Sequence, residues 1–118
     1  MAADPKHPQS PLAERKCKAC EGGVEPLPES AARTLLADVK GWELVGGKMI
    51  RKTVVCKDFL DAVGLINRIA PVAEAEDHHP DLHLARYKRL TIQLSTHSIG
   101  GLSENDFIVT AKIDLLLG

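Results

Sequence analysis

The chain has few aromatic residues and almost no net charge. Tryptophan, tyrosine and phenylalanine make up 3% of its 118 residues, against 44% hydrophobic residues in all, so the core has to be built from aliphatic side chains. There are 15 Lys and Arg and 16 Asp and Glu, which gives a formal net charge of −1. Proteins that bind nucleic acid usually carry a basic excess, because phosphate contacts need Lys and Arg. The balance therefore argues against a nucleic-acid partner.

The sequence also lacks long apolar runs and glycine-rich phosphate motifs. No run approaches the roughly 20 apolar residues of a membrane-spanning helix, and residues 1–16 have no apolar stretch typical of a secretory signal. Neither a GxGxxG fingerprint nor a P-loop is present. Three cysteines, an odd number, fit a reducing compartment better than a disulfide framework. We expect a cytoplasmic protein that makes no membrane contact.

The first part of the chain differs from the rest in composition. Residues 1–24 are rich in Pro, Lys, Ala and Gly and show no hydrophobic periodicity. Such a segment does not form a core of its own. We predict a mobile N-terminal arm over residues 1–24 and a single domain over residues 25–118.

The predicted arm contains a CxxC motif formed by Cys17 and Cys20. A structural zinc site normally has four ligands, and Cys56 and His7 are distant candidates for the other two. The alternative is a pair of exposed thiols. Because Cys56 falls within a predicted strand, we expect it to belong to the core.

Hydrophobic periodicity predicts three helices and four strands in the domain. The expected helices are 28–39, 59–73 and the segment after Ser103; the expected strands are 42–45, 50–56, 82–84 and 90–95. Gly46-Gly47 is a hairpin signal, and Asp58 and Ser103 are capping residues. A hairpin repeated around a helix predicts an α+β fold of order α-β-β-α-β-β-α, with an antiparallel sheet and helices on one face.

The second predicted helix has two notable features. Its apolar residues suggest a buried stripe, widened by Ala62 and Ile69. The stripe consists of Phe59, Val63, Ile66, Ala70 and Ala73. Pro71 lies inside the same pattern, and a proline there removes a backbone hydrogen bond. We expect a kink at this point or a second short helix that starts there.

The densest group of titratable side chains lies in the sequence EDHHPDLH. Glu74 and His78 are four residues apart and share a face where the helix ends. Pro80 favours an extended conformation at His79, so the two imidazoles are presented from a fixed turn. His97 follows a predicted strand and precedes a glycine loop, a common position for functional residues.

Three interpretations of these histidines are possible from the residues alone. Two or three of them with Asp81 or Asp106 would be ligands for zinc or iron, although the order HHPDLH matches no established spacing such as HExxH. Alternatively, they are solvated turn residues. In the third interpretation they transfer protons, because the unperturbed pKa of histidine, about 6.5, suits that task near neutrality.

The sequence resembles a known family, the pterin-4a-carbinolamine dehydratases. The resemblance rests on Glu74, His78-His79-Pro80, Tyr87, His97 and Asp106 in this order and spacing. Similar segments surround them: GW at 41–42, KDF at 57–59, LSTH at 94–97 and GGLSENDF at 100–107. The likeness extends from about Pro28 to Asp114.

The resemblance implies both an architecture and an activity. The family fold is a four-stranded antiparallel sheet with three helices packed on one face, assembled into homodimers or homotetramers. The activity is that of a lyase, 4a-hydroxytetrahydrobiopterin dehydratase, in tetrahydrobiopterin biosynthesis and recycling. A 4a-hydroxytetrahydropterin left by an aromatic amino-acid hydroxylase loses water and becomes the quinonoid dihydropterin. The pterin is the substrate, and no cofactor or metal is implied.

The resemblance also assigns site residues. The expected catalytic residues are His78, His79 and His97. The expected substrate-binding residues are Glu74, Asp77, Pro80, Ser95, Thr96 and Asp106. Glu74 would orient a histidine, whereas Asp106 has helix capping as an equal alternative.

A non-catalytic role on the same fold is the alternative function. Some relatives act as dimerisation cofactors of a transcription factor, and others resemble Rubisco assembly factors. Retention of all three histidines favours the enzyme. This chain departs from many animal members at Leu82, where they carry Trp, and has one extra residue before Tyr87. Both changes affect the expected pocket wall.

Overall fold

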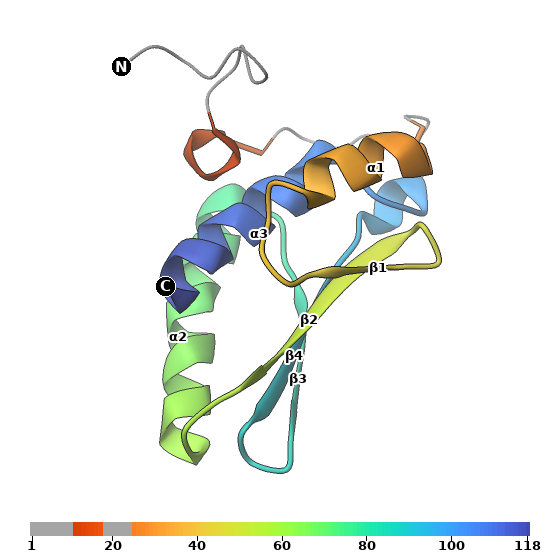
Figure 1. Cartoon of the computed structure of the whole chain (residues 1–118). Coiled ribbons are helices and arrows are strands. Elements are labelled where there is room, and N and C mark those ends of the chain that lie inside the picture. Colours follow the sequence, from red (N-terminus) through yellow and green to blue (C-terminus); the bar gives the residue numbers. More distant parts are fainter. Residues whose placement is uncertain (1–10, 18–24) are drawn as a thin grey trace.

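The computed structural model describes residues 11–17 and 25–118, and it has an α+β fold (Figure 1). In this part of the chain three α-helices cover one face of a four-stranded antiparallel sheet. The helices are α1 (Glu29–Leu36), α2 (Phe59–Glu76) and α3 (Glu104–Leu117), and the strands are β1 (Glu43–Val45), β2 (Met49–Val55), β3 (Asp81–Ala85) and β4 (Arg89–Leu94). The predicted fold class and the predicted order of helices and strands are confirmed.

The sheet has the strand order β1-β2-β4-β3, with two hairpins at its ends joined by the central β2–β4 pair. Gly46 and Gly47, the predicted hairpin signal, both have positive φ angles, and the turn closes with a 3.1 Å bond from Lys48 N to Val45 O. This conformation favours glycine because a Cβ atom would clash with the backbone. The second hairpin turns at Arg86 and Tyr87, which adopt positive φ despite their side chains.

The core is mainly aliphatic, as the scarcity of aromatic residues predicts, with Trp42 and Phe107 as its aromatic members. On β4, Leu90, Ile92 and Leu94 are buried and alternate with residues that are more exposed. Helix α3 is buried on all sides over residues 105–111, because α2 and the N-terminal segment both pack against it. A helix without an exposed face over nearly two turns fixes the residues at its start rigidly.

The buried stripe of α2 differs from the predicted one. Ala62, Leu65, Ile69 and Ala73 face the core, whereas Phe59 is 53% exposed and Ala70 is also exposed. The helix is apolar around much of its circumference, so spacing alone allows two overlapping stripes. This stripe packs against the rest of the domain, including α3.

Pro71 does not divide α2. The helix is continuous from Phe59 to Glu76, so the second short helix that we considered does not form. Both Pro71 and Asn67 are exposed, and water can therefore bind the Asn67 carbonyl that lacks its usual donor. The helix consequently continues to the segment that carries the histidines.

The predicted first helix extends too far at its C-terminal end. Helix α1 ends at Leu36, and Gly41, with φ +73°, lies beyond it in the connection to β1. Val39 is buried in that connection and needs no helix to reach the core. Trp42, also buried, donates from Nε1 to Asp114 Oδ1 at 2.8 Å and so joins the connection to α3.

Part of the predicted arm packs against the domain. Residues Leu12–Glu14 form a 3₁₀ helix, η1, that contacts α3 and buries Leu12 in the core. Residues 11–17 therefore contact the domain, while the predicted division into a mobile arm over residues 1–24 and a domain over residues 25–118 stays a prediction. His7 and Cys20 lie outside the described residues, so the CxxC prediction is not tested. None of the helices in residues 11–17 and 25–118 is long and apolar enough to cross a membrane.

Candidate active site

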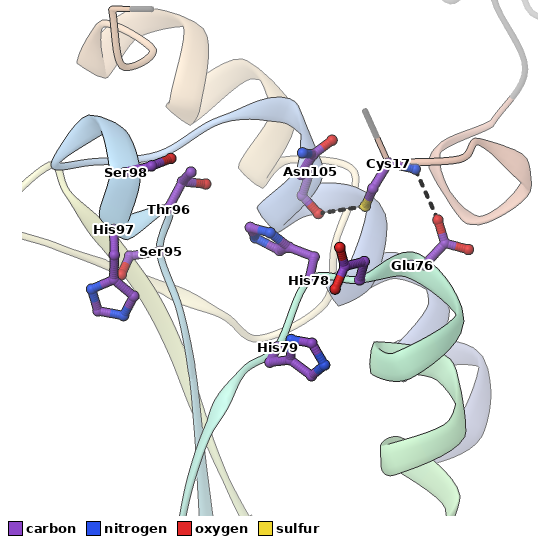
Figure 2. Close-up of a pocket in the computed structure, with 10 residues that line it drawn as sticks. Cys17, Glu76, His78, His79, Ser95, Thr96, His97, Ser98 and Asn105 are labelled. Carbon is purple, nitrogen blue, oxygen red and sulfur yellow. Dashed lines mark hydrogen bonds between the residues drawn. The ribbon is translucent and has the colours of Figure 1, made fainter. Parts of the chain in front are cut away.

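A pocket of about 480 Å³ opens where α2 ends, β4 ends and α3 begins (Figure 2). It brings together residues from four separate parts of the chain. The lining residues are Cys17, Glu76, Asp77, His78, His79, Ser95, Thr96, His97, Ser98 and Asn105. All three histidines expected to be catalytic therefore line one pocket, although His97 is far from the other two in sequence.

The end of α2 places two imidazoles in this pocket. Asp77 adopts a left-handed conformation with φ +49° and ends the helix, and His78 N donates back to Ala73 O at 3.2 Å. The chain then becomes extended and enters β3 at Asp81. His78 and His79 thus leave the helix through an irregular turn, which allows two adjacent side chains to face the same pocket.

His78 is held by a buried carboxylate. Its Nε2 donates to Asp106 Oδ1 at 2.6 Å, and the Asp106 side chain is fully buried. The other carboxylate oxygen, Oδ2, accepts from Thr96 Oγ1 at 2.8 Å and from Ser103 N at 2.9 Å. Asp106 therefore caps α3 and fixes His78 at the same time. A carboxylate bound to Nε2 leaves Nδ1 as the nitrogen that can exchange a proton.

His79 has a different carboxylate partner. Its Nε2 lies 2.8 Å from Glu74 Oε1, and both side chains are largely exposed. The sequence spacing pairs Glu74 with His78 across one helical turn. The structure pairs it with His79 instead, because the left-handed Asp77 turns the chain before His78 can lie above Glu74. An exposed pair of this kind orients the imidazole but contributes little to stability.

His97 lies on a separate loop that is closed at its base. It begins the 3₁₀ helix η2 (His97–Ile99), which immediately follows Thr96. Thr96 N donates to Gly101 O at 2.7 Å, and Gly101 N donates to Thr96 O at 3.4 Å. Because this bridge joins the two ends of the loop, the position of His97 depends on the residues at the bridge.

Gly101 offers a test of how tightly this bridge is packed. A Cβ at this position would lie 2.7 Å from Pro26 Cβ, so Gly101→Ala should lower the free energy of unfolding by about 1–3 kcal/mol. Gly64→Ala is the control, because nothing lies within 4 Å of the added Cβ on α2. That substitution should stabilise the protein by about 0.5–1 kcal/mol. Urea denaturation measures both values, and equal changes in the two variants would contradict the crowding at the bridge.

The predicted substrate-binding residues occupy two kinds of position. Asp77, Ser95 and Thr96 line the pocket directly. Glu74 and Asp106 are not among the lining residues and contact the histidines that are. Pro80, half-buried, follows His79 at the start of β3. Their roles toward a substrate stay predictions.

Sequence reasoning missed part of the pocket wall. Cys17 N donates to Glu76 Oε1 at 2.8 Å, and Cys17 Sγ lies 3.6 Å from Asn105 O. The second oxygen of Glu76 accepts from Lys112 Nζ at 3.2 Å. The sequence drew attention to the EDHHPD and SEND segments, which contain Glu76 and Asn105, but no local pattern indicated that Cys17 would lie beside them.

Two side chains of this wall, Cys17 and Glu76, have pKa values shifted in opposite directions. Burial, reinforced by the negative charge of Glu76, raises the pKa of the Cys17 thiol to about 12. The backbone N–H of Cys17, with help from Lys112, lowers the pKa of Glu76. Near neutral pH the thiol therefore stays protonated, and the Glu76 carboxylate stays charged.

The metal interpretation gains no support from the described residues. Within residues 11–17 and 25–118, no three His, Cys, Asp or Glu side chains are grouped as metal ligands would be. His78 and His79 are instead bound through Nε2 to separate carboxylates.

The chain belongs to the pterin-4-alpha-carbinolamine dehydratase family, whose model matches residues 25–116. A protein from Nitrosomonas eutropha, provisionally named as such a dehydratase, is 46% identical over 107 residues, which cover 90% of this chain and 93% of the relative. A protein from Dechloromonas aromatica with the same provisional name is 45% identical over 106 residues, which cover 90% of this chain and 93% of that relative.

Two solved structures share the fold. A transcriptional coactivator/pterin dehydratase from Brucella melitensis matches with a TM-score of 0.74 and 35% identity, covering 80% of this chain and 100% of that chain. A pterin dehydratase-like protein identified as a RuBisCO assembly factor in the alpha-carboxysome matches with a TM-score of 0.56 and 19% identity. The match covers 66% of this chain and 90% of that chain. The second likeness concerns the fold alone.

Proposed function

We propose that the protein is a hydro-lyase that dehydrates 4a-hydroxytetrahydropterin to the quinonoid dihydropterin in tetrahydropterin recycling. The observation that carries the proposal is that His78, His79 and His97 line one pocket. The family membership and the provisional names of the relatives point to the same reaction. A protein that served only as a binding module would have no use for three imidazoles at one site.

The reaction needs two proton transfers. Hydroxide is a poor leaving group, so a general acid protonates the 4a-hydroxyl as its bond to carbon breaks. The lone pair on the neighbouring ring nitrogen forms a double bond to that carbon, and a general base accepts the proton that this nitrogen loses. Water is released, and no electrons are gained or lost overall. Imidazolium and imidazole are suited to these two roles near neutral pH.

We assign the two transfers to His79 and His97, with His78 as a third participant. His79 is oriented by Glu74, and His97 approaches from the loop after β4, so the two rings come from different elements of the fold (Figure 2). His78, fixed by the buried Asp106, has the least freedom of the three. Asp77, Ser95 and Thr96 would contact the pterin, and Pro80 would hold the turn. The reaction as assigned uses no cofactor or metal.

Turnover by the purified protein is the direct test. We expect it to accelerate the dehydration of synthetic 4a-hydroxytetrahydropterin, followed by the absorbance change, and to keep its rate after treatment with a chelator. Loss of the rate on chelation, with recovery on adding a metal, would instead favour the metal-dependent enzyme. A folded but inert protein that binds a defined protein partner would favour the assembly or coactivator role.

We also propose a cytoplasmic homodimer or homotetramer. The described surface has large apolar side chains near the start of α2 and the adjacent strand ends that a monomer leaves open to water. These are Val55, Phe59, Leu60 and Tyr87, which are between 53% and 80% exposed. Self-association would remove them from water.

A further inference from the structure

We propose that residues 11–17 form a wall of the pterin pocket and act as a positioning segment that sets its affinity for substrate. This inference rests on the proposed function and extends it to a part of the chain that precedes the match to the family model, which begins at residue 25. Cys17 is the residue of this segment that lines the pocket. Leu12 and Arg15 attach the segment that carries Cys17 to the domain.

The segment is attached to the domain at its beginning. Leu12 is 6% exposed and belongs to the hydrophobic core, through the contact between η1 and α3. Arg15 then forms an ion pair with Glu104, in the first turn of α3, at 3.4 Å. These contacts fix the segment on the helix whose first turn also carries Asn105 of the pocket.

The segment is attached again at its end, inside the pocket. The Glu76 side chain is 6% exposed and lies between Cys17 N and the ammonium group of Lys112. Glu76 therefore connects Cys17 to the end of α2 and to the middle of α3. A charge-assisted bond to a backbone N–H in a largely buried place is among the stronger hydrogen bonds. Cys17 cannot leave the wall without exposing this carboxylate or leaving its Oε1 without the Cys17 donor.

The chemistry of Cys17 indicates binding and not proton transfer. Its thiol stays protonated near neutral pH and lies against Asn105 O, so it presents an uncharged surface to the pocket. Such a surface contacts the substrate equally before and during the reaction. Losing a contact of this kind raises KM and leaves kcat unchanged, whereas losing a proton-transfer group lowers kcat.

Leu12→Ser is the informative variant, because Leu12 belongs to the hydrophobic core and is not among the pocket-lining residues, so we expect it to act by anchoring the segment. We expect KM for 4a-hydroxytetrahydropterin to rise between about threefold and tenfold, with kcat within about twofold of wild type. Leu12→Ile, which keeps an aliphatic side chain at this position, should have the wild-type KM. Leu115→Ser is the matched control, since Leu115 is 72% exposed on α3.

Two measurements without turnover complete the experiment. The dissociation constant of an oxidised pterin that lacks the 4a-hydroxyl should rise in Leu12→Ser by the same factor as KM. Cys17→Leu, which adds bulk to the wall without touching the anchor, should also weaken binding of this pterin. In a Cys20→Ser background, the bound pterin should slow alkylation of Cys17 by a maleimide, measured by peptide mass spectrometry at alkaline pH, where a larger fraction of the thiol is ionised.

The outcomes separate this inference from the proposed function. If the wild type turns over substrate but Leu12→Ser has the KM of Leu115→Ser, the inference is wrong and the dehydratase assignment stands. If the wild type binds the oxidised pterin without turning over substrate, and binding weakens in Leu12→Ser, the wall is supported and the assigned activity fails. Unchanged alkylation of Cys17 at saturating pterin would overturn the inference in either case.

Discussion

Replacing His79 or His97 with alanine should lower the rate of dehydration by about 10²–10⁴-fold, the usual contribution of one general acid or base. Each substitution removes one of the two proton-transfer groups that we assign, and the other one cannot be donor and acceptor in the same step. The loss should appear in kcat, because the methyl group of alanine still leaves the rest of the pocket able to bind the pterin. Stopped-flow absorbance with synthetic 4a-hydroxytetrahydropterin measures it.

His83→Ala provides the matched control for both substitutions. His83 is an exposed histidine on β3, it is paired with Gln93 at 3.3 Å, and it is not among the pocket residues. We expect its rate to equal that of wild type, and all three variants should unfold at similar urea concentrations because the three side chains are exposed. A His79→Ala or His97→Ala enzyme with full kcat would remove that residue from the assigned chemistry.

The second large effect concerns stability. Asp106→Ala should lower the free energy of unfolding by about 3–5 kcal/mol, because one buried carboxylate accepts bonds from three other groups. The substitution leaves His78 Nε2, Thr96 Oγ1 and Ser103 N without this acceptor. Asp106→Asn keeps the shape of the side chain and one acceptor oxygen, so its loss should be smaller. Urea denaturation followed by circular dichroism gives the three values.

Asp58→Ala separates helix capping from the rest of this effect. Asp58 caps α2 through a 2.8 Å bond from Asp61 N, and it is exposed. Removing a cap of this kind costs about 0.5–2 kcal/mol. The excess loss in Asp106→Ala then belongs to the contacts with His78 and Thr96. Equal losses in the two variants would mean that Asp106 serves as a cap alone.

Much of the fold could be predicted because its signals are local. The alternation of Leu90, Ile92 and Leu94 places β4 in the sheet, and Ser103 with Asp106 predicts the start of α3. Such signals depend on neighbouring residues in the chain. The face of α2 that is buried could not be read in the same way, because it depends on which surface packs against the sheet.

The site could be predicted only in part, for a related reason. The resemblance identified the three histidines, and the structure places them together in one pocket. The partner of Glu74 depends on the left-handed turn at Asp77, which the sequence did not indicate. The place of Cys17 depends on the packing of η1 against α3, a contact between segments far apart in the chain. Local patterns carry no information on such pairings.

Asp106 both caps α3 and holds His78, and this combination has an evolutionary consequence. A descendant without the proposed dehydration would be free to replace His97 and His79, because both are exposed and neither belongs to the core. Replacing Asp106 in the same descendant would remove the hydrogen bonds to Ser103 N at the start of α3 and to Thr96 Oγ1. Proteins of this fold that lack the activity should therefore retain the aspartate more often than the two exposed histidines.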